Sequence, residues 1–75
     1  MVKIVGILYK ESLKVFVYEN GHQIQGKKCL LNNCAKTIAL FAEFYNVNTI
    51  NIMGDIEIIQ IVAKELKQQY SLKTT

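Results

Sequence analysis

The sequence predicts an α+β domain with the element order β-β-β-α-β-α, in which two helices cover a four-stranded mixed sheet of strand order 3-2-1-4. Two observations predict this class. Apolar and β-branched residues first form runs or alternate with period two, and later they recur at helical spacing. In addition, Asn20-Gly21 separates two alternating segments, and this dipeptide is the strongest short signal for a β-hairpin. We therefore expect a three-stranded meander, a helix, a fourth strand and a second helix.

Length and composition predict one folded domain spanning residues 1–75. The hydrophobic fraction of 51% and the charged fraction of 20% are typical of a folded protein rather than a disordered one. Small domains bury a smaller share of their surface than large ones, so a partner chain would add stability. The N-terminal segment contains neither a secretion signal nor an apolar run of membrane length. We therefore expect a cytoplasmic protein with reduced cysteines and no membrane contact.

Three strands are expected before the first helix. Val2–Tyr9 is almost continuously apolar, which is typical of a strand that is covered on both sides. Leu13–Glu19 is rich in β-branched and aromatic residues and follows a polar break. The third strand begins at His22, directly after the Asn-Gly turn. The three strands should pair in an antiparallel meander, because their connections are short.

The stretch GHQIQGKK, from Gly21 to Lys28, differs at one position from the phosphate-binding pattern G-x-x-x-x-G-K-[ST]. Lys28 stands where the magnesium-binding hydroxyl belongs, and His-Gln-Ile-Gln alternates like an edge strand. The register expected from the Asn-Gly turn places Val17 opposite Ile24, so both side chains share one face. We therefore interpret the stretch as half of a hairpin and expect no nucleotide cofactor.

The first helix is predicted from about Cys34 to about Asn46, with Asn32 and Asn33 as suitable N-caps. Its apolar side chains recur at helical spacing. They are Ala35, Ile38, Leu40, Phe41, Ala42, Phe44 and Tyr45. This wide stripe indicates a helix that packs against the sheet.

The remaining segment predicts a strand and a second helix. Val47–Met53 alternates and forms the fourth strand, which the first helix returns to the same sheet beside the first strand and parallel to it. Asp55 is interpreted as the N-cap of a helix that ends near Tyr70. The tail from Ser71 onward is expected to fray.

The expected sheet is apolar on both faces. With a first hairpin turn at Glu11-Ser12, one face forms a core under the first helix from Leu8, Val15, Val17, Ile24, Ile50 and Ile52. The second face, the predicted partner-binding surface, contains Val5, Ile7, Tyr9, Phe16, Tyr18 and Met53. A patch of this size is unusual on a monomer. Either the second helix covers it, or both helices share the first face and the patch meets another protein or a second copy of this chain.

The basic residues predict a weaker alternative, which is sequence-nonspecific nucleic-acid binding. All nine are lysine, and the formal net charge is +3. Lysine attracts phosphate but lacks the planar fork with which arginine reads base edges. Lys14, Lys27 and Lys28 are expected to lie close together across the second hairpin, where they are candidates for phosphate contact beside Phe16 and Tyr18.

No pattern predicts catalysis or a metal site. His22 has no Ser or Cys nucleophile at a spacing that would form a catalytic pair. Cys29 and Cys34, even together with His22, do not match the spacing of structural zinc ligands. We therefore expect a non-enzymatic protein without catalytic residues, metal or cofactor.

The element order resembles the first half of the ribonuclease H-like superfamily, which includes Holliday-junction resolvases and actin-like ATPases. The glycine in IVGIL, the strand VFVYENG and the strand end INIMGD carry this resemblance, which extends from Val2 to about Tyr70. It implies the same sheet topology. Enzymes of that superfamily have an acidic metal ligand on the first strand, whereas Val2–Tyr9 contains no Asp or Glu, and Asp55 alone cannot hold two metal ions. The departure argues against nuclease activity.

The residue usage suggests a source. Lys, Ile and Asn are abundant, as is typical of an AT-rich genome such as that of a virus or mobile element. One hypothesis is therefore that the protein inhibits a host factor by binding to it.

Overall fold

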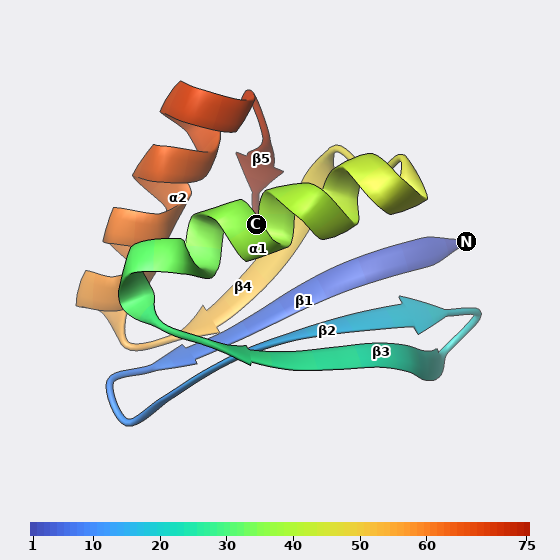
Figure 1. Cartoon of the computed structure of the whole chain (residues 1–75), viewed down its shortest axis with the longest axis horizontal. Helices are drawn as coiled ribbons and strands as arrows, with labels where there is room; N and C mark the ends of the chain where they lie inside the picture. Colours follow the sequence, from blue (N-terminus) through green and yellow to red (C-terminus); the bar gives the residue numbers. More distant parts are fainter.

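The computed structural model describes all 75 residues and contains a five-stranded mixed sheet and two helices (Figure 1). The strands are β1 (Val2–Tyr9), β2 (Ser12–Glu19), β3 (His22–Cys29), β4 (Thr49–Gly54) and β5 (Lys73–Thr74). The helices are α1 (Leu31–Tyr45) and α2 (Ile56–Tyr70). The sheet order is β3-β2-β1-β4-β5, so the α+β class and the order 3-2-1-4 are confirmed, with one strand added at the edge. Neither helix combines the length and the apolar character that crossing a membrane requires.

The added strand, β5, lies where the sequence predicted a frayed tail. It is parallel to β4 and pairs Lys73 with Thr49. The N–H of Thr75 donates to the carbonyl oxygen of Ile50 at 2.9 Å, and the N–H of Ile52 donates to that of Thr75 at 3.1 Å. These backbone bonds hold the C-terminal residues against β4. Two strand residues are too few to produce a recognisable alternation, so the sequence did not indicate this strand.

The first hairpin turns at Lys10-Glu11, with Tyr9 opposite Ser12, rather than at Glu11-Ser12 as predicted. Val5 consequently lies opposite Phe16, whereas a turn at Glu11-Ser12 would pair it with Tyr18. The predicted register is therefore wrong by two residues. Because side chains alternate with period two, a shift of two leaves every side chain on its predicted face.

Asp55 occupies the N-cap position of α2, but its carboxylate makes no capping bond to the helix. Oδ2 of Asp55 instead accepts a hydrogen bond from the N–H of Lys10 at 2.7 Å. The N–H of Asp55 donates to the carbonyl oxygen of Leu8 at 2.9 Å. The interpretation of Asp55 as a side-chain cap is thus wrong, because this residue ties the β1–β2 turn to the start of α2.

The second hairpin turns at Asn20-Gly21 as predicted, and both residues have positive φ, 52° and 83°. A β-bulge beyond the turn changes the later register. Val17 pairs with Gln25, and Ile24 is the extra residue, 43% exposed and outside the core. The prediction that Ile24 joins the core is therefore wrong. The bulge interrupts the alternation of faces, since Gln23 pairs with Tyr18 and Gln25 with Val17. The sequence alternates polar and apolar residues across Ile24, so the pattern did not indicate this interruption.

The first helix begins three residues earlier than predicted, with Leu30 rather than an asparagine at its N-cap. Oδ1 of Asn33 accepts a hydrogen bond from the N–H of Leu30 at 3.0 Å, so this asparagine supports the helix start from inside it. Two members of the predicted apolar stripe face solvent, because Leu40 is 59% and Phe44 is 79% exposed. The core-facing stripe of α1 is narrower than predicted.

The core lies between one face of the sheet and both helices, since α1 packs over β1 and β2 while α2 packs over β1 and β4 (Figure 1). Its buried members come from three strands and both helices. They are Ile4, Leu8, Val15, Val17, Cys34, Ala35, Ile38, Ala42, Ile50, Ile58, Val62 and Leu66, with Ile52 partly buried against them. The second helix therefore shares the face that the first helix covers, which was one of the two predicted arrangements.

Candidate docking surface

The face of the sheet opposite the helices, which we call the open face, is not covered by any other element of the chain. It brings together all six predicted partner-binding residues, which are Val5, Ile7, Tyr9, Phe16, Tyr18 and Met53. Tyr9 is 46% and Met53 is 50% exposed, and the other four are half-buried among their neighbours. One side of the molecule therefore presents a continuous apolar surface to solvent.

The strand register places these side chains in direct contact range. Val5 lies opposite Phe16 on β2, and Ile7 lies beside Met53 on β4. The rings of Phe16 and Tyr18 are tilted by 48° with their centroids 6.5 Å apart, a separation typical of aromatic pairs. A hollow of about 550 Å³ has Val5, Ile7, Tyr18 and Met53 among its lining residues. The surface therefore contains a hollow and an aromatic pair and is not flat.

The β3 bulge contributes to this surface by placing Gly26 opposite Phe16. A Cβ atom at position 26 would lie 3.2 Å from Cδ1 of Phe16, closer than ordinary van der Waals contact. Glycine at this position leaves room for the Phe16 ring to lie against β3. Sequence reasoning missed this contact, because it depends on the unpredicted bulge.

Lys3, Lys14 and Lys28 lie on β1, β2 and β3 of the open face and are here called the open-face lysines. Lys73 of β5 pairs with Thr49, which alternates with Met53, so its side chain also leaves the sheet on this side. Lys3 lies opposite Tyr18, and Lys14 lies opposite Lys28. The predicted group Lys14, Lys27 and Lys28 lines one small hollow of about 290 Å³ beside Phe16. Lys27 pairs with the core residue Val15, so strand alternation directs its side chain toward the helix side, unlike those of the other two. Lys3 was missed, although it alternates with Val5 and Ile7 along β1. No Asp or Glu occupies an open-face strand position, so the face is basic.

The cysteines and the histidine lie away from the open face. Cys29 ends β3, Cys34 lies in the first turns of α1, and both are free thiols. The Cys29 thiol donates a hydrogen bond to the carbonyl oxygen of Leu13 at 3.8 Å. Burial raises the pKa of both thiols, and it is the main cause of the shift in each case. The pKa of Cys34 rises to about 12, so both thiols are protonated at neutral pH. His22 is exposed at the turn opposite Glu19. No three His, Cys, Asp or Glu side chains are grouped closely enough to hold a metal ion.

No protein-family model and no curated protein matches the sequence. Among solved structures, the chain is similar to a protein of Bacteroides thetaiotaomicron VPI-5482 with an actin-like ATPase fold and unknown function, with a TM-score of 0.68 and 12% identity. The match covers 97% of this chain and 31% of that chain, so this chain spans about a third of the length of that protein. At this identity the likeness shows the fold alone. It confirms the actin-like part of the predicted resemblance.

Proposed function

We propose that this chain is a non-enzymatic, cytoplasmic binding protein that docks against another protein through its open face. The observation that carries the proposal is the placement of both helices on one side of the sheet, which leaves six large apolar side chains on the other. Full burial of such a side chain contributes roughly 1.5 to 3 kcal/mol, so a partner that covered several of them would gain substantial binding free energy. Tyr, Phe and Met are also residues that interfaces favour.

The positive charge on the open face favours a different protein, rather than a second copy of this chain, as the binding partner. A face-to-face homodimer would bring two sets of open-face lysines together, and like charges across an interface are unfavourable. A partner that surrounds an apolar patch with Asp and Glu would pair with those lysines at the rim. The proposed partner is therefore an acidic protein surface, and a homodimer is the alternative that a mass measurement distinguishes.

A catalytic role has less support. The carboxylate of Asp55 is engaged by the N–H of Lys10, and β1 supplies no acidic side chain beside it, so a degenerate ribonuclease H-like enzyme lacks its metal ligands. The chain also corresponds to only 31% of the similar actin-like ATPase-fold structure. We therefore propose neither nuclease nor ATPase activity.

Replacing Met53 by glutamate tests the docking proposal. Met53 is half exposed, so the variant should fold, while a carboxylate in the apolar surface should cost at least about 2 kcal/mol of binding free energy, as at other interface hot spots. Immobilised wild type and variant would be compared by quantitative mass spectrometry of the proteins each retains from a lysate of the natural host. Proteins that bind the open face should be lost from the variant. Phe16→Glu should lose the same set.

The matched control is Phe44→Glu, which places the same charge on an exposed phenylalanine of α1, on the opposite side of the molecule. It should retain what the wild type retains. Sedimentation analysis of the wild type and the three variants would reveal self-association. A wild-type dimer that Met53→Glu converts to a monomer would identify a second copy of this chain as the partner. A monomeric wild type that retains the same proteins as Met53→Glu would contradict the proposal.

The paired lysines favour a second candidate function, which is binding of single-stranded nucleic acid on the same face. Lys14 and Lys28 lie opposite each other next to the Phe16–Tyr18 pair, so phosphate attraction and base stacking are available side by side. With three lysines in contact, binding to a single-stranded oligonucleotide should weaken roughly 20-fold between about 50 and 200 mM salt. Fluorescence anisotropy would measure this dependence, and affinity that does not change with salt would exclude phosphate contact by these lysines.

A further inference from the structure

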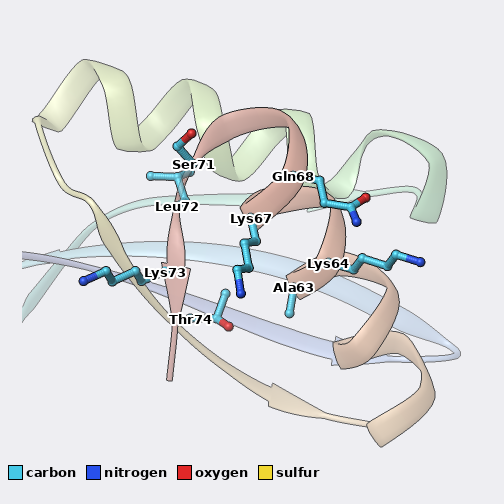
Figure 2. Close-up of a pocket in the computed structure, with 8 residues that line it drawn as sticks. All are labelled: Ala63, Lys64, Lys67, Gln68, Ser71, Leu72, Lys73 and Thr74. Carbon is cyan, nitrogen blue, oxygen red and sulfur yellow. The ribbon is translucent and has the colours of Figure 1, made fainter.

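A second basic region lies between the C-terminal half of α2 and β5, at the edge of the sheet beside β4. It is a hollow of about 1030 Å³, which we call the α2–β5 hollow (Figure 2). Its lining residues are Ala63, Lys64, Lys67, Gln68, Ser71, Leu72, Lys73 and Thr74. Most of them are polar, and none is acidic.

The backbone fixes the position of this hollow. Residues 64, 67, 68 and 71 share one side of α2, because their spacing corresponds to helical turns. Ser71 has a φ of 56°, and the N–H of Leu72 donates to the carbonyl oxygen of Leu66 at 3.0 Å, which closes the end of the helix. The chain then reverses into β5, which is bonded to β4, so Lys73 and Thr74 return beside the helix. The lining residues are therefore held together by the fold.

The lysines of the hollow make no ion pair within the protein. The hollow lysines are Lys64, Lys67 and Lys73, and the structure's ion pair joins two other residues, Lys10 and Glu57. The side chains of Gln68, Ser71 and Thr74 make no hydrogen bond elsewhere in the molecule. The hollow therefore combines three positive charges with three further side chains that are free to donate.

The arrangement of the lysines indicates an extended ligand. Lys67 points into the space between α2 and β5, whereas Lys64 and Lys73 extend toward opposite sides of the hollow (Figure 2). In this arrangement a single small anion would not contact all three ammonium groups unless the flexible lysine side chains turned toward it. A chain of several anionic groups could follow them from one side of the hollow to the other.

We propose that the α2–β5 hollow binds a chain of phosphate groups, as found in a free polyphosphate or in the backbone of a single-stranded nucleic acid. Lysine ammonium groups attract phosphate as point charges, and the Ser71 and Thr74 hydroxyls and the Gln68 amide supply neutral donors. Lys73 lies at the β5 edge of the open face, but the site uses none of the six apolar residues of that face and does not depend on the proposed docking function.

Two triple variants of equal charge test the site. In the hollow variant, all three hollow lysines are replaced by glutamine. In the open-face variant, all three open-face lysines are replaced by glutamine. Each variant lowers the formal net charge from +3 to zero, since three positive charges are removed. Lys64, Lys67 and Lys73 are exposed, so the first variant should fold, and thermal denaturation would verify this. Isothermal titration with inorganic triphosphate and fluorescence anisotropy with a single-stranded thymidine oligonucleotide would measure binding.

The hollow variant should lose at least tenfold in affinity for triphosphate, whereas the open-face variant should stay within about threefold of wild type. If the oligonucleotide shows the same pattern and competes with triphosphate, a nucleic-acid backbone is the source of the phosphates. If only triphosphate binding is weakened in the hollow variant, while oligonucleotide binding is unchanged, the source is a free polyphosphate. The proposal is overturned if the wild type binds neither probe, if both variants lose equally, or if the open-face variant loses more. In those cases the hollow lysines only offset the carbonyl end of α2 and keep β5 hydrated.

Discussion

Gly54→Ala should destabilise the protein by about 3 kcal/mol or more, because the substitution combines backbone strain with a collision. Gly54 ends β4 with a φ of 136°, a conformation that residues with a side chain rarely adopt. An added Cβ would overlap the carbonyl oxygen of Leu8 on the neighbouring strand. That oxygen also accepts the hydrogen bond from Asp55, so relieving the overlap would disturb the junction between β1 and α2. Urea unfolding followed by circular dichroism would measure the loss.

Gly21→Ala is the matched control for this prediction. Gly21 also has positive φ, 83°, but no atom lies within 4 Å of the position its Cβ would take. Only the conformational cost of a left-handed residue applies, roughly 1 to 2 kcal/mol. Equal losses in the two variants would show that the collision with Leu8 contributes nothing and that only the φ angle matters.

Short connections and the helical crossover were sufficient to predict the sheet order, and periodicity was sufficient to predict the face on which most strand residues lie. It could not determine the first hairpin register, because a two-residue shift leaves each face with the same set of side chains. The structure selects the Lys10-Glu11 turn, and the Asp55 carboxylate that binds this turn is 45 positions away from Lys10 in sequence. Long-range contacts of this kind leave no local pattern.

Helical periodicity likewise overestimated the buried face of α1. Leu40 and Phe44 extend the apolar stripe of the sequence, yet both face solvent, because α2 and the sheet occupy only the side of α1 that bears Ile38 and Ala42. An apolar residue at helical spacing shows which side of a helix is apolar but not how much of that side the neighbouring elements cover.

All six apolar residues of the candidate docking surface were predicted from the sequence. The sequence did not decide whether the second helix covers this surface or lies beside the first helix on the other face. No strand long enough to recognise follows the second helix, so the handedness of crossover connections did not constrain where that helix lies. The packing of Ile58, Val62 and Leu66 against β1 and β4 places α2 beside α1. The alternation of β1 could have added Lys3 to the surface, whereas the contact between Gly26 and Phe16 required the bulge to be known.

The buried thiol of Cys34 should make the stability of the protein fall at alkaline pH. Burial, and then the neighbouring Cys29 thiol and Glu65 carboxylate, raise the pKa of Cys34 from 9.0 to about 12. Between these two values the unfolded chain has lost the proton while the folded protein retains it. The contribution of the protonated Cys34 thiol to the free energy of unfolding is therefore complete below about pH 9 and is lost as the pH rises toward 12. The free energy of unfolding should decrease with a slope of up to about 1.4 kcal/mol per pH unit in this window.

Cys34→Ala isolates this contribution, because alanine keeps a small apolar side chain in α1 but cannot titrate. Urea unfolding of both proteins from pH 7 to pH 11 would give two stability profiles, and their difference removes the titration of groups that the proteins share. The variant should be less stable than wild type at pH 7, because a buried sulfur is lost, and the gap should close above pH 9. A difference that stays constant across this range would mean that the folded protein tolerates the thiolate, and that the thiol is less isolated from water than its complete burial in the core implies.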